Sequence, residues 1–264
     1  MRSCVSAGSH NTSEAFFESP EPILNMSEIT FTIDGVEVRG RHGQSVLKAA
    51  QAAGVYIPHL CAYKDLIPHG SCRVCSVRCN GRIQAACVQT ITEGMVIENN
   101  TAEILEFRCA ILDMLFVEGN HYCMFCEKSG MCELQALAYR FGITAPQFPL
   151  QNPDRDIDMS HPDVYLDHNR CILCGRCVRV SQELDQKNVF QFVGRGHRKR
   201  LQVNGEALAE TDLRVTDEVV ASCPVGALMR KRVGYRVPVG ERCYDFEPIG
   251  GPREPVAATT TEEN

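Results

Sequence analysis

Alternating apolar and polar residues near the N-terminal end predict a β-hairpin followed by a helix. Residues 29–38 alternate on both sides of Asp34-Gly35, a pair typical of a two-residue hairpin turn. A helical stretch follows over residues 45–53 and meets Gly54, which suits the position after a helix end. Three further short strands are predicted at residues 73–77, 83–86 and 95–98. This mixture predicts a small α+β domain over residues 27–100.

Helical periodicity replaces the alternation after this domain. Residues 102–118 form an amphipathic pattern, and a second helix is predicted to start near Cys132. The apolar stripe of the first helix consists of Leu105, Cys109, Leu112 and Phe116. Cys109 is therefore expected in the core, and residues 101–142 are predicted to be a short helical domain.

A change in composition marks the third part of the chain. Residues 143–163 hold four prolines among polar residues and are predicted to be a linker. Residues 164–240 are predicted to form a compact unit centred on cysteines. Within it, residues 190–208 are expected to be short strands around an Asn204-Gly205 turn.

The two ends of the chain are expected to lie outside the folded units. Residues 1–26 are predicted to be a disordered leader, with Met26 as a candidate for the true start. Residues 241–264 are predicted to be a C-terminal tail, whose last part is rich in Ala, Thr and Glu.

Composition excludes several classes of protein. No run of about 18 apolar residues occurs, so no transmembrane helix is predicted. The formal net charge of −6 argues against nucleic acid as a main partner, because a polyanion needs a basic surface. The 15 cysteines, in contrast, far exceed ordinary usage. A secreted disulfide framework is disfavoured, because the count is odd and residues 1–22 contain no apolar core of a signal peptide.

The most specific cysteine pattern places Cys171, Cys174 and Cys177 at intervals of three, with Cys223-Pro224 much later. Bacterial [4Fe–4S] ferredoxins use these C-x2-C-x2-C and C-P elements. Three ligands so close in sequence would crowd a tetrahedral zinc ion. These four cysteines therefore predict one [4Fe–4S] cluster.

A second set, Cys61, Cys72, Cys75 and Cys87, falls within the first α+β domain. Its spread suits a [2Fe–2S] cluster, which takes two thiolates on each iron, although the first gap of ten residues differs from the four of plant-type ferredoxins. On spacing alone, zinc remains an alternative. Cys79 lies nearby and is expected to be a non-ligand on the hairpin.

A third set consists of His121, Cys123, Cys126 and Cys132. Three cysteines leave one ligand missing, and an imidazole can replace a thiolate on iron. On spacing alone, a zinc site of three cysteines and one histidine is equally good. The remaining Cys4, Cys79, Cys109 and Cys243 lie outside spaced groups. No catalytic residue is assigned, because no G-x-G-x-x-G, P-loop or nucleophile arrangement stands out.

Five sequence phrases carry a resemblance to a known family. They are IPHLC (57–61), SCRVCSV (71–77), EGNHYCMFCEKSGMCELQ (118–135), RCILCGRCVR (170–179) and SCPVGAL (222–228). Their order resembles the N-terminal iron–sulfur region of the large peripheral subunit of respiratory complex I. EGNHYC and residues 231–250 further resemble the small diaphorase subunit of cytoplasmic NAD-reducing [NiFe]-hydrogenases. One residue separates His121 from Cys123, where many complex I relatives have three.

This resemblance implies a fold and a function. It implies a ferredoxin-like β-grasp domain with a [2Fe–2S] cluster, a short helical [4Fe–4S] domain ligated by one histidine and three cysteines, and a C-terminal ferredoxin-like [4Fe–4S] domain. It also implies a cytoplasmic electron-transfer subunit, itself without catalysis. Its partners would be a flavoprotein subunit that binds NADH and FMN and the small and large [NiFe]-hydrogenase subunits.

Two alternatives remain at this point. The equivalent subunit of an NAD-dependent formate dehydrogenase or a complex I-like NADH dehydrogenase would share the clusters and differ in its partner. A zinc-stabilised adaptor without redox chemistry would use the same cysteine sets for about three zinc ions.

Overall fold

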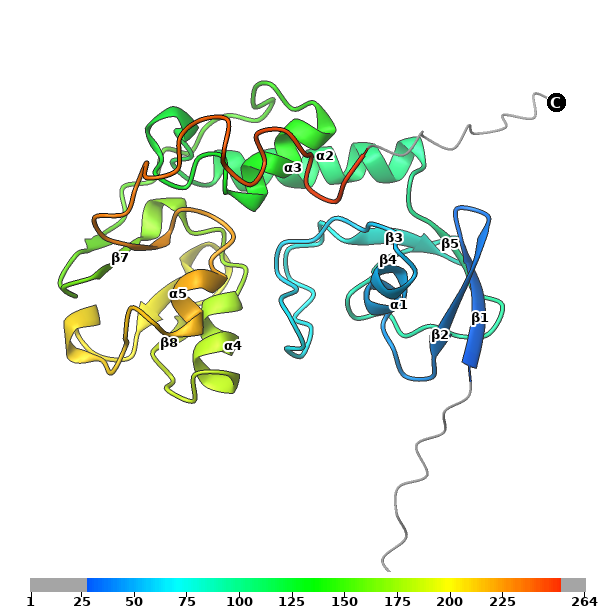
Figure 1. Cartoon of the computed structure of the whole chain (residues 1–264), viewed down its shortest axis with the longest axis horizontal. Helices are drawn as coiled ribbons and strands as arrows, with labels where there is room; N and C mark the ends of the chain where they lie inside the picture. The colour runs from blue at the N-terminus through cyan, green and yellow to red at the C-terminus, as the bar shows by residue number, and fades with distance from the viewer. Residues whose placement is uncertain (1–27, 253–264) are drawn as a thin grey trace, which may run out of the picture.

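The computed structural model describes residues 28–252, so the predicted leader over residues 1–26, and Cys4 with it, lies outside the described residues. The described chain forms two lobes joined by a pair of helices that run along one side of both (Figure 1). Among these residues, no helix is long and apolar enough to cross a membrane.

The N-terminal lobe is a mixed five-stranded sheet in the order β2-β1-β5-β3-β4, with helix α1 packed against it (Figure 1). Its elements are β1 (Glu28–Ile33), β2 (Val36–Arg41), α1 (Val46–Ala52), β3 (Ser76–Cys79), β4 (Arg82–Ala85) and β5 (Val96–Glu98). β1 pairs antiparallel with β2 and parallel with β5. The core between sheet and helix holds Phe31, Ile33 and Ile57, each at most 1% exposed.

Local sequence explains why these elements form where they do. Asp34 and Gly35 both take positive φ values, as the tight hairpin turn requires. Ser45 caps α1 by accepting a hydrogen bond from the Lys48 N–H at 3.3 Å. The predicted hairpin and helix are thus confirmed. β3 begins at Ser76, later than predicted, because residues up to Cys75 belong to a loop in which Arg73 has a φ of 59°.

Helices α2 (Ala102–Val117) and α3 (Glu133–Phe141) connect the lobes. Thr101 caps α2, and Gly142 ends α3 in the left-handed conformation. The predicted apolar stripe of α2 is wrong in part, because the helix turns Ile104, Arg108 and Ile111 inward and leaves Cys109 only half-buried.

The C-terminal lobe contains a three-stranded sheet in the order β10-β7-β6, a β8-β9 hairpin and two short helices. Its elements are β6 (Ile157–Asp158), β7 (Val164–Asp167), α4 (Arg176–Glu183), β8 (Phe190–Val193), β9 (Arg200–Val203), α5 (Glu218–Ser222) and β10 (Leu228–Arg230). Four 3₁₀ turns complete the described chain: η1 (Cys123–Phe125), η2 (His168–Arg170), η3 (Gly196–Arg198) and η4 (Leu208–Glu210).

The β8-β9 hairpin turns at a different place from the one predicted. The strands pair across residues 194–199, whereas Asn204-Gly205 follows β9 and leads out of the hairpin. Gly194 makes the turn possible, because its φ is 70° and a Cβ there would lie 2.3 Å from the Arg198 carbonyl oxygen.

Parts of the predicted linker and of the predicted tail pack against the helices α2 and α3. Residues 143–163 include β6, and the Gln147 N–H donates to the buried Asp113 carboxylate at 2.8 Å. The described part of the tail, residues 241–252, lies along α3, where Arg140 donates to the carbonyls of Ile249 and Gly251. In Figure 1 this red segment runs across α2 and α3.

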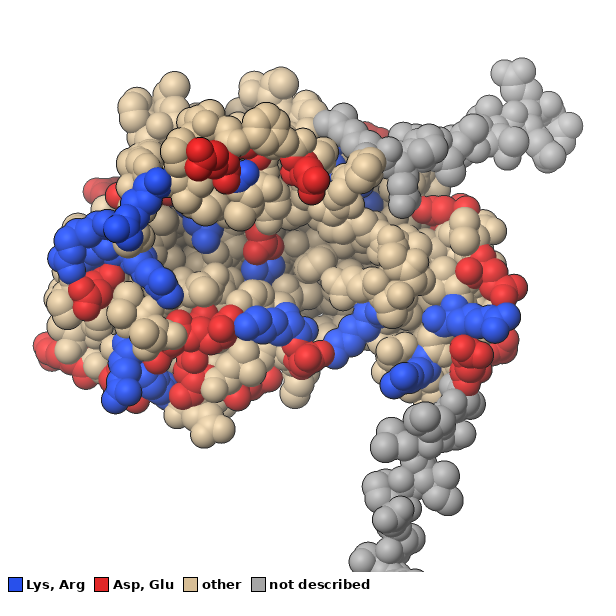
Figure 2. Space-filling view, viewed as in Figure 1, with Lys and Arg blue, Asp and Glu red and all other residues tan. Residues whose placement is uncertain are grey.

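Charged side chains of both signs are scattered over the face in Figure 2, and the hollow between the lobes is mostly uncharged.

Candidate metal centres

The structure brings Cys61, Cys72, Cys75 and Cys87 together at the inner edge of the N-terminal lobe. All four are at most 8% exposed. The Cys61 N–H donates to the Cys72 sulfur at 3.4 Å. Interaction with the neighbouring thiols of Cys72 and Cys87, Cys72 first, lowers the pKa of Cys61 below its ordinary value. Four buried soft sulfur ligands, of which Cys61 and Cys75 both have lowered pKa values that favour the thiolate, suit iron or zinc.

The loop that carries the first three of these cysteines reaches toward the other lobe. It leaves α1, passes between the lobes and returns to β3, as the cyan segment of Figure 1 shows. The positive φ of Arg73 turns the chain between Cys72 and Cys75. Cys87 follows β4 in the sequence. The residue before it, Ala86, donates its N–H to the Cys75 carbonyl at 3.0 Å, which holds Cys87 beside the loop.

A second cavity is lined by His121, Cys123, Cys126 and Cys132. The histidine comes from the loop after α2, two cysteines from the turn η1 and its end, and Cys132 from the N-cap of α3. The sequence-predicted set is thus gathered around one space.

His121 has an orphaned nitrogen in this cavity. Its Nε2 is buried and has no hydrogen-bond partner among the described residues, and its ring packs edge-on against Phe116 with centroids 5.6 Å apart. Burial, with the Arg170 charge adding to it, lowers the pKa of His121 to about 4. The ring is therefore neutral at physiological pH. A buried nitrogen left unpaired costs about 1–3 kcal/mol, which a bound metal would offset.

A third cavity is lined by Cys171, Cys174, Cys177 and Cys223. Positive φ values at Leu173 and Gly175 coil the loop before α4, and Cys223 enters directly after α5. The other walls are mostly apolar and include Leu166, Phe192 and Leu201. Burial raises the pKa of Cys171 to about 11 and that of Cys174 to about 12. Thiolates in this space therefore need a positive partner, which metal would supply.

The second and third cavities share a wall. Gly226 lines the second cavity and Val225 the third, and both belong to the segment that follows Cys223. A Cβ at Gly226 would lie 2.7 Å from the Cys126 sulfur, so only glycine fits there. The segment is fixed to α3 by the Glu133 N–H, which donates to the Pro224 carbonyl at 2.9 Å.

Two arginines of α4 connect all three sites. Arg179 donates to the Cys61 carbonyl at 2.5 Å and to the Ile67 carbonyl at 2.8 Å, which holds the N-terminal loop onto α4. Arg176 is 2% exposed and donates to both carboxylate oxygens of Glu133 at 2.6 Å. Its guanidinium carbon lies over the ring of Tyr63, 5.1 Å from the ring centroid. Glu133 adjoins Cys132, so these contacts fix the three ligand loops relative to one another.

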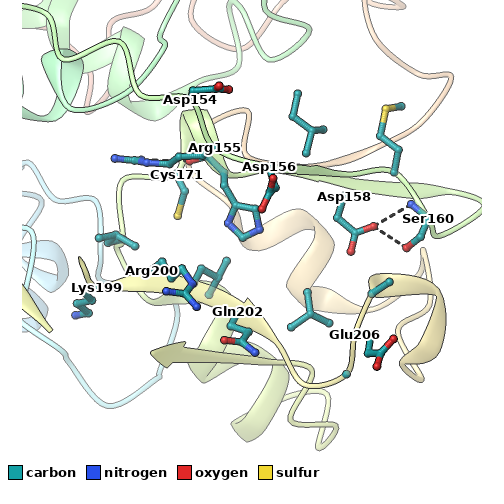
Figure 3. Close-up of a pocket in the computed structure, with 18 residues that line it drawn as sticks. Asp154, Arg155, Asp156, Asp158, Ser160, Cys171, Lys199, Arg200, Gln202 and Glu206 are labelled. Atoms are coloured by element: carbon teal, nitrogen blue, oxygen red, sulfur yellow. Dashed lines mark hydrogen bonds between the residues drawn. The ribbon is translucent and has the colours of Figure 1, made fainter. Parts of the chain in front are cut away.

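The third site also approaches the surface. Cys171 and Leu173 line both its cavity and an open groove between β6 and β9. Figure 3 shows Cys171 and Arg155 at one end of this groove and Ser160, hydrogen-bonded to Asp158, at the other.

The donor sets fit multi-iron clusters. Within residues 28–252, no three His, Cys, Asp or Glu side chains converge closely enough to bind one metal ion. Each cysteine of a [4Fe–4S] cluster binds a different iron, so its ligands need not converge on one point. The remaining described cysteines, Cys79, Cys109 and Cys243, line none of these cavities.

Three family models match successive parts of the chain. Residues 26–102 match a 2Fe-2S iron-sulfur cluster binding domain. Residues 108–147 match the iron-sulfur binding region of NADH-ubiquinone oxidoreductase-G, and residues 161–229 match the ferredoxin-like domain of NADH-quinone oxidoreductase subunit 3. The predicted order of a [2Fe–2S] domain and two further iron–sulfur regions is confirmed.

The chain is 38% identical over 222 residues to the gamma subunit of the NAD-reducing hydrogenase HoxS of Cupriavidus necator, covering 84% of this chain and 95% of that one. It belongs to the family of NAD-reducing hydrogenase gamma subunits. A chain in the crystal structure of an NAD+-reducing [NiFe]-hydrogenase in the H2-reduced state superimposes with a TM-score of 0.82 at 46% identity, covering 85% of this chain and 97% of that one. An NADH-quinone oxidoreductase subunit of Rhizobium meliloti is 37% identical over 215 residues, and the match spans 79% of this chain and 25% of the relative.

The predicted resemblance to the small diaphorase subunit, which rests on EGNHYC and residues 231–250, is confirmed by the match to the gamma subunit. The predicted resemblance to the complex I subunit, which rests on the order of the five phrases, is confirmed by the family models. Sequence reasoning missed the arginines Arg108, Arg176 and Arg179. The first offered a signal, because it falls with Ile104 and Ile111 on one face of α2.

Proposed function

We propose that this chain is the iron–sulfur electron-transfer subunit of an NAD-reducing [NiFe]-hydrogenase. It would relay electrons between a flavoprotein subunit that binds NADH and FMN and the small and large hydrogenase subunits, in the cytoplasm. The observation that carries the proposal is the gathering of twelve predicted ligands into three neighbouring buried sites. The near full-length match to a hydrogenase gamma subunit favours this partner over a formate dehydrogenase or a complex I-like NADH dehydrogenase.

In this proposal each site has a defined ligand set. The [2Fe–2S] ligands are Cys61, Cys72, Cys75 and Cys87. The two [4Fe–4S] sets are His121, Cys123, Cys126 and Cys132, and Cys171, Cys174, Cys177 and Cys223. The corresponding domains would be residues 27–100, 101–142 and 164–240. The orphaned His121 Nε2 is the strongest support for the histidine as a ligand.

Bound clusters supply one-electron transfer, and the protein sets where and at what potential it takes place. The chain's own residues bury the thiols, exclude water and fix the spacing of the sites. Arg176 and Arg179 hold the three ligand loops, and Gly226 allows two sites to lie back to back. The groove beside Cys171 brings the third site near the surface, where a partner's redox centre can approach.

Metal analysis of the full-length chain, purified anaerobically with its native partners, tests this proposal. We expect a brown protein with about ten irons, two plus four plus four, in this subunit. Nickel in the purified complex would identify the partner as a hydrogenase, and its absence with ten irons present would point to another dehydrogenase. A colourless chain with about three zinc ions would instead establish the adaptor alternative.

We expect His121→Cys to lower the reduction potential of the second cluster, on the order of 100 mV. A thiolate in place of the neutral imidazole adds one negative charge, which disfavours the added electron. Redox titration followed by EPR measures the midpoint, and the other two clusters serve as internal references. An unchanged midpoint would remove His121 from the ligand set.

A further inference from the structure

Arg108 is a fully buried cation at the junction of α2 with the N-terminal sheet. Its exposure is 0%, and it is among the largest fully buried side chains described. Its guanidinium donates to the Ser76 carbonyl at 2.8 Å, to the Asn99 carbonyl at 3.0 Å and to the Asn99 side-chain oxygen at 2.7 Å. All three acceptors are neutral, so these bonds position the charge without compensating it.

No carboxylate pairs with this arginine. Among the ion pairs of residues 28–252, none includes Arg108, and its Nε is buried without a hydrogen-bond partner. Asp34 is the carboxylate that attracts it most, but the two form no ion pair: Asp34 Oδ1 accepts from the N–H groups of Asn99 and Asn100, and Asp34 Oδ2 is buried without a hydrogen-bond partner. The positive charge of Arg140 repels that of Arg108 and so adds to the cost of burying it. An isolated buried charge is costly, so a counter-charge is expected nearby.

The first cysteine site, once it holds a cluster, is the candidate for that counter-charge. Ser76, whose carbonyl Arg108 binds, directly follows Cys75. Burial lowers the pKa of Arg108 to about 10, with attraction to Cys75 the largest opposing influence, so the group is charged at neutral pH.

We propose that Arg108 is the buried counter-ion of the [2Fe–2S] cluster and raises the reduction potential of that cluster. The inference rests on the proposed function. Two ferric ions, two sulfides and four thiolates sum to a charge of −2, and one-electron reduction makes it −3. A fixed cation beside the site in a low-dielectric interior stabilises the more negative state more strongly. Arg108 is therefore a positioning and charge-tuning residue and not a ligand.

Three variants of the full-length chain separate charge from shape: Arg108→Gln, Arg108→Lys and the control Arg78→Gln. Arg78 lies on β3 in the same lobe, and its charge is already compensated by Glu98 at 3.2 Å and by Glu103. Redox titration followed by EPR of the reduced [2Fe–2S] signal gives the midpoint in each variant. Iron content and the [4Fe–4S] midpoints are measured on the same samples.

We expect the [2Fe–2S] midpoint to fall in Arg108→Gln and to stay near the wild-type value in Arg108→Lys and Arg78→Gln. If Arg108→Gln loses the [2Fe–2S] EPR signal and Arg108→Lys retains it, that result would also support the requirement for a positive charge at position 108. An unshifted midpoint in Arg108→Gln, or loss of the signal in both Arg108 variants, would overturn the proposal. A wild-type chain without iron would instead overturn the proposed function, so the two failures are distinguishable.

Discussion

Cys174→Ser is expected to reduce the iron content of the chain from about ten to about six. Cys174 is 8% exposed and lines the third cavity with the other three cysteines of its set. A serine hydroxyl is nearly the same size as the thiol but is a poor ligand for the irons of a cluster, so this site should fail to hold one. Iron and sulfide analysis of anaerobically purified protein measures the loss.

Two other cysteines provide matched controls for this prediction. Cys109 is half-buried on α2, and Cys79 is buried in the core of the N-terminal lobe. Burial raises the pKa of both, as expected of protonated structural thiols. Cys109→Ser and Cys79→Ser should each retain about ten irons. Loss of four irons from a control, or full iron content in Cys174→Ser, would refute the ligand assignment.

Arg176→Met is expected to lower the free energy of unfolding by about 3 kcal/mol. The arginine side chain is 3% exposed and that of Glu133 is 24% exposed, so the substitution leaves a largely enclosed carboxylate without its cation. Tyr63 loses its cation–π contact at the same time. In anaerobic thermal scans of the holoprotein, the apparent midpoint should fall by roughly 6–12 °C.

An exposed ion pair gives the control for Arg176. Arg232 binds Asp163 at 2.6 Å, but its side chain is 72% exposed. Arg232→Met should therefore change stability by less than about 0.5 kcal/mol. In a double-mutant cycle, Glu133→Gln should recover part of the loss in Arg176→Met, because it removes the uncompensated charge. Additive effects of the two substitutions would show that the pair does not act as a unit.

Local signals in the sequence predicted the elements they control. Asp34-Gly35, Ser45 and Gly54 determine a hairpin and a helix within a few residues, and the structure confirms both. The β8-β9 turn was mispredicted because Asn204-Gly205 is the stronger local turn pair. The actual turn depends on how closely Gly194 must approach Arg198, which is a tertiary contact.

The cysteine sets were predictable for a different reason. The ligands of one cluster must reach a common space. Short regular spacings, such as that of Cys171, Cys174 and Cys177, are therefore recognisable in the sequence itself. The arginines that join the sites leave no such pattern. Arg179 meets the Cys61 carbonyl across more than a hundred residues, and only the folded chain brings them together.

Gly226 limits how this protein could have been assembled during evolution. The sequence suggests separate modules on either side of residues 143–163, yet the wall behind Cys126 is supplied by the segment after Cys223. A gene fragment that encoded the middle module alone would lack that wall. The two modules are therefore expected to be inherited together, and the match to the much longer Rhizobium meliloti relative, which covers 79% of this chain, fits transfer as one block.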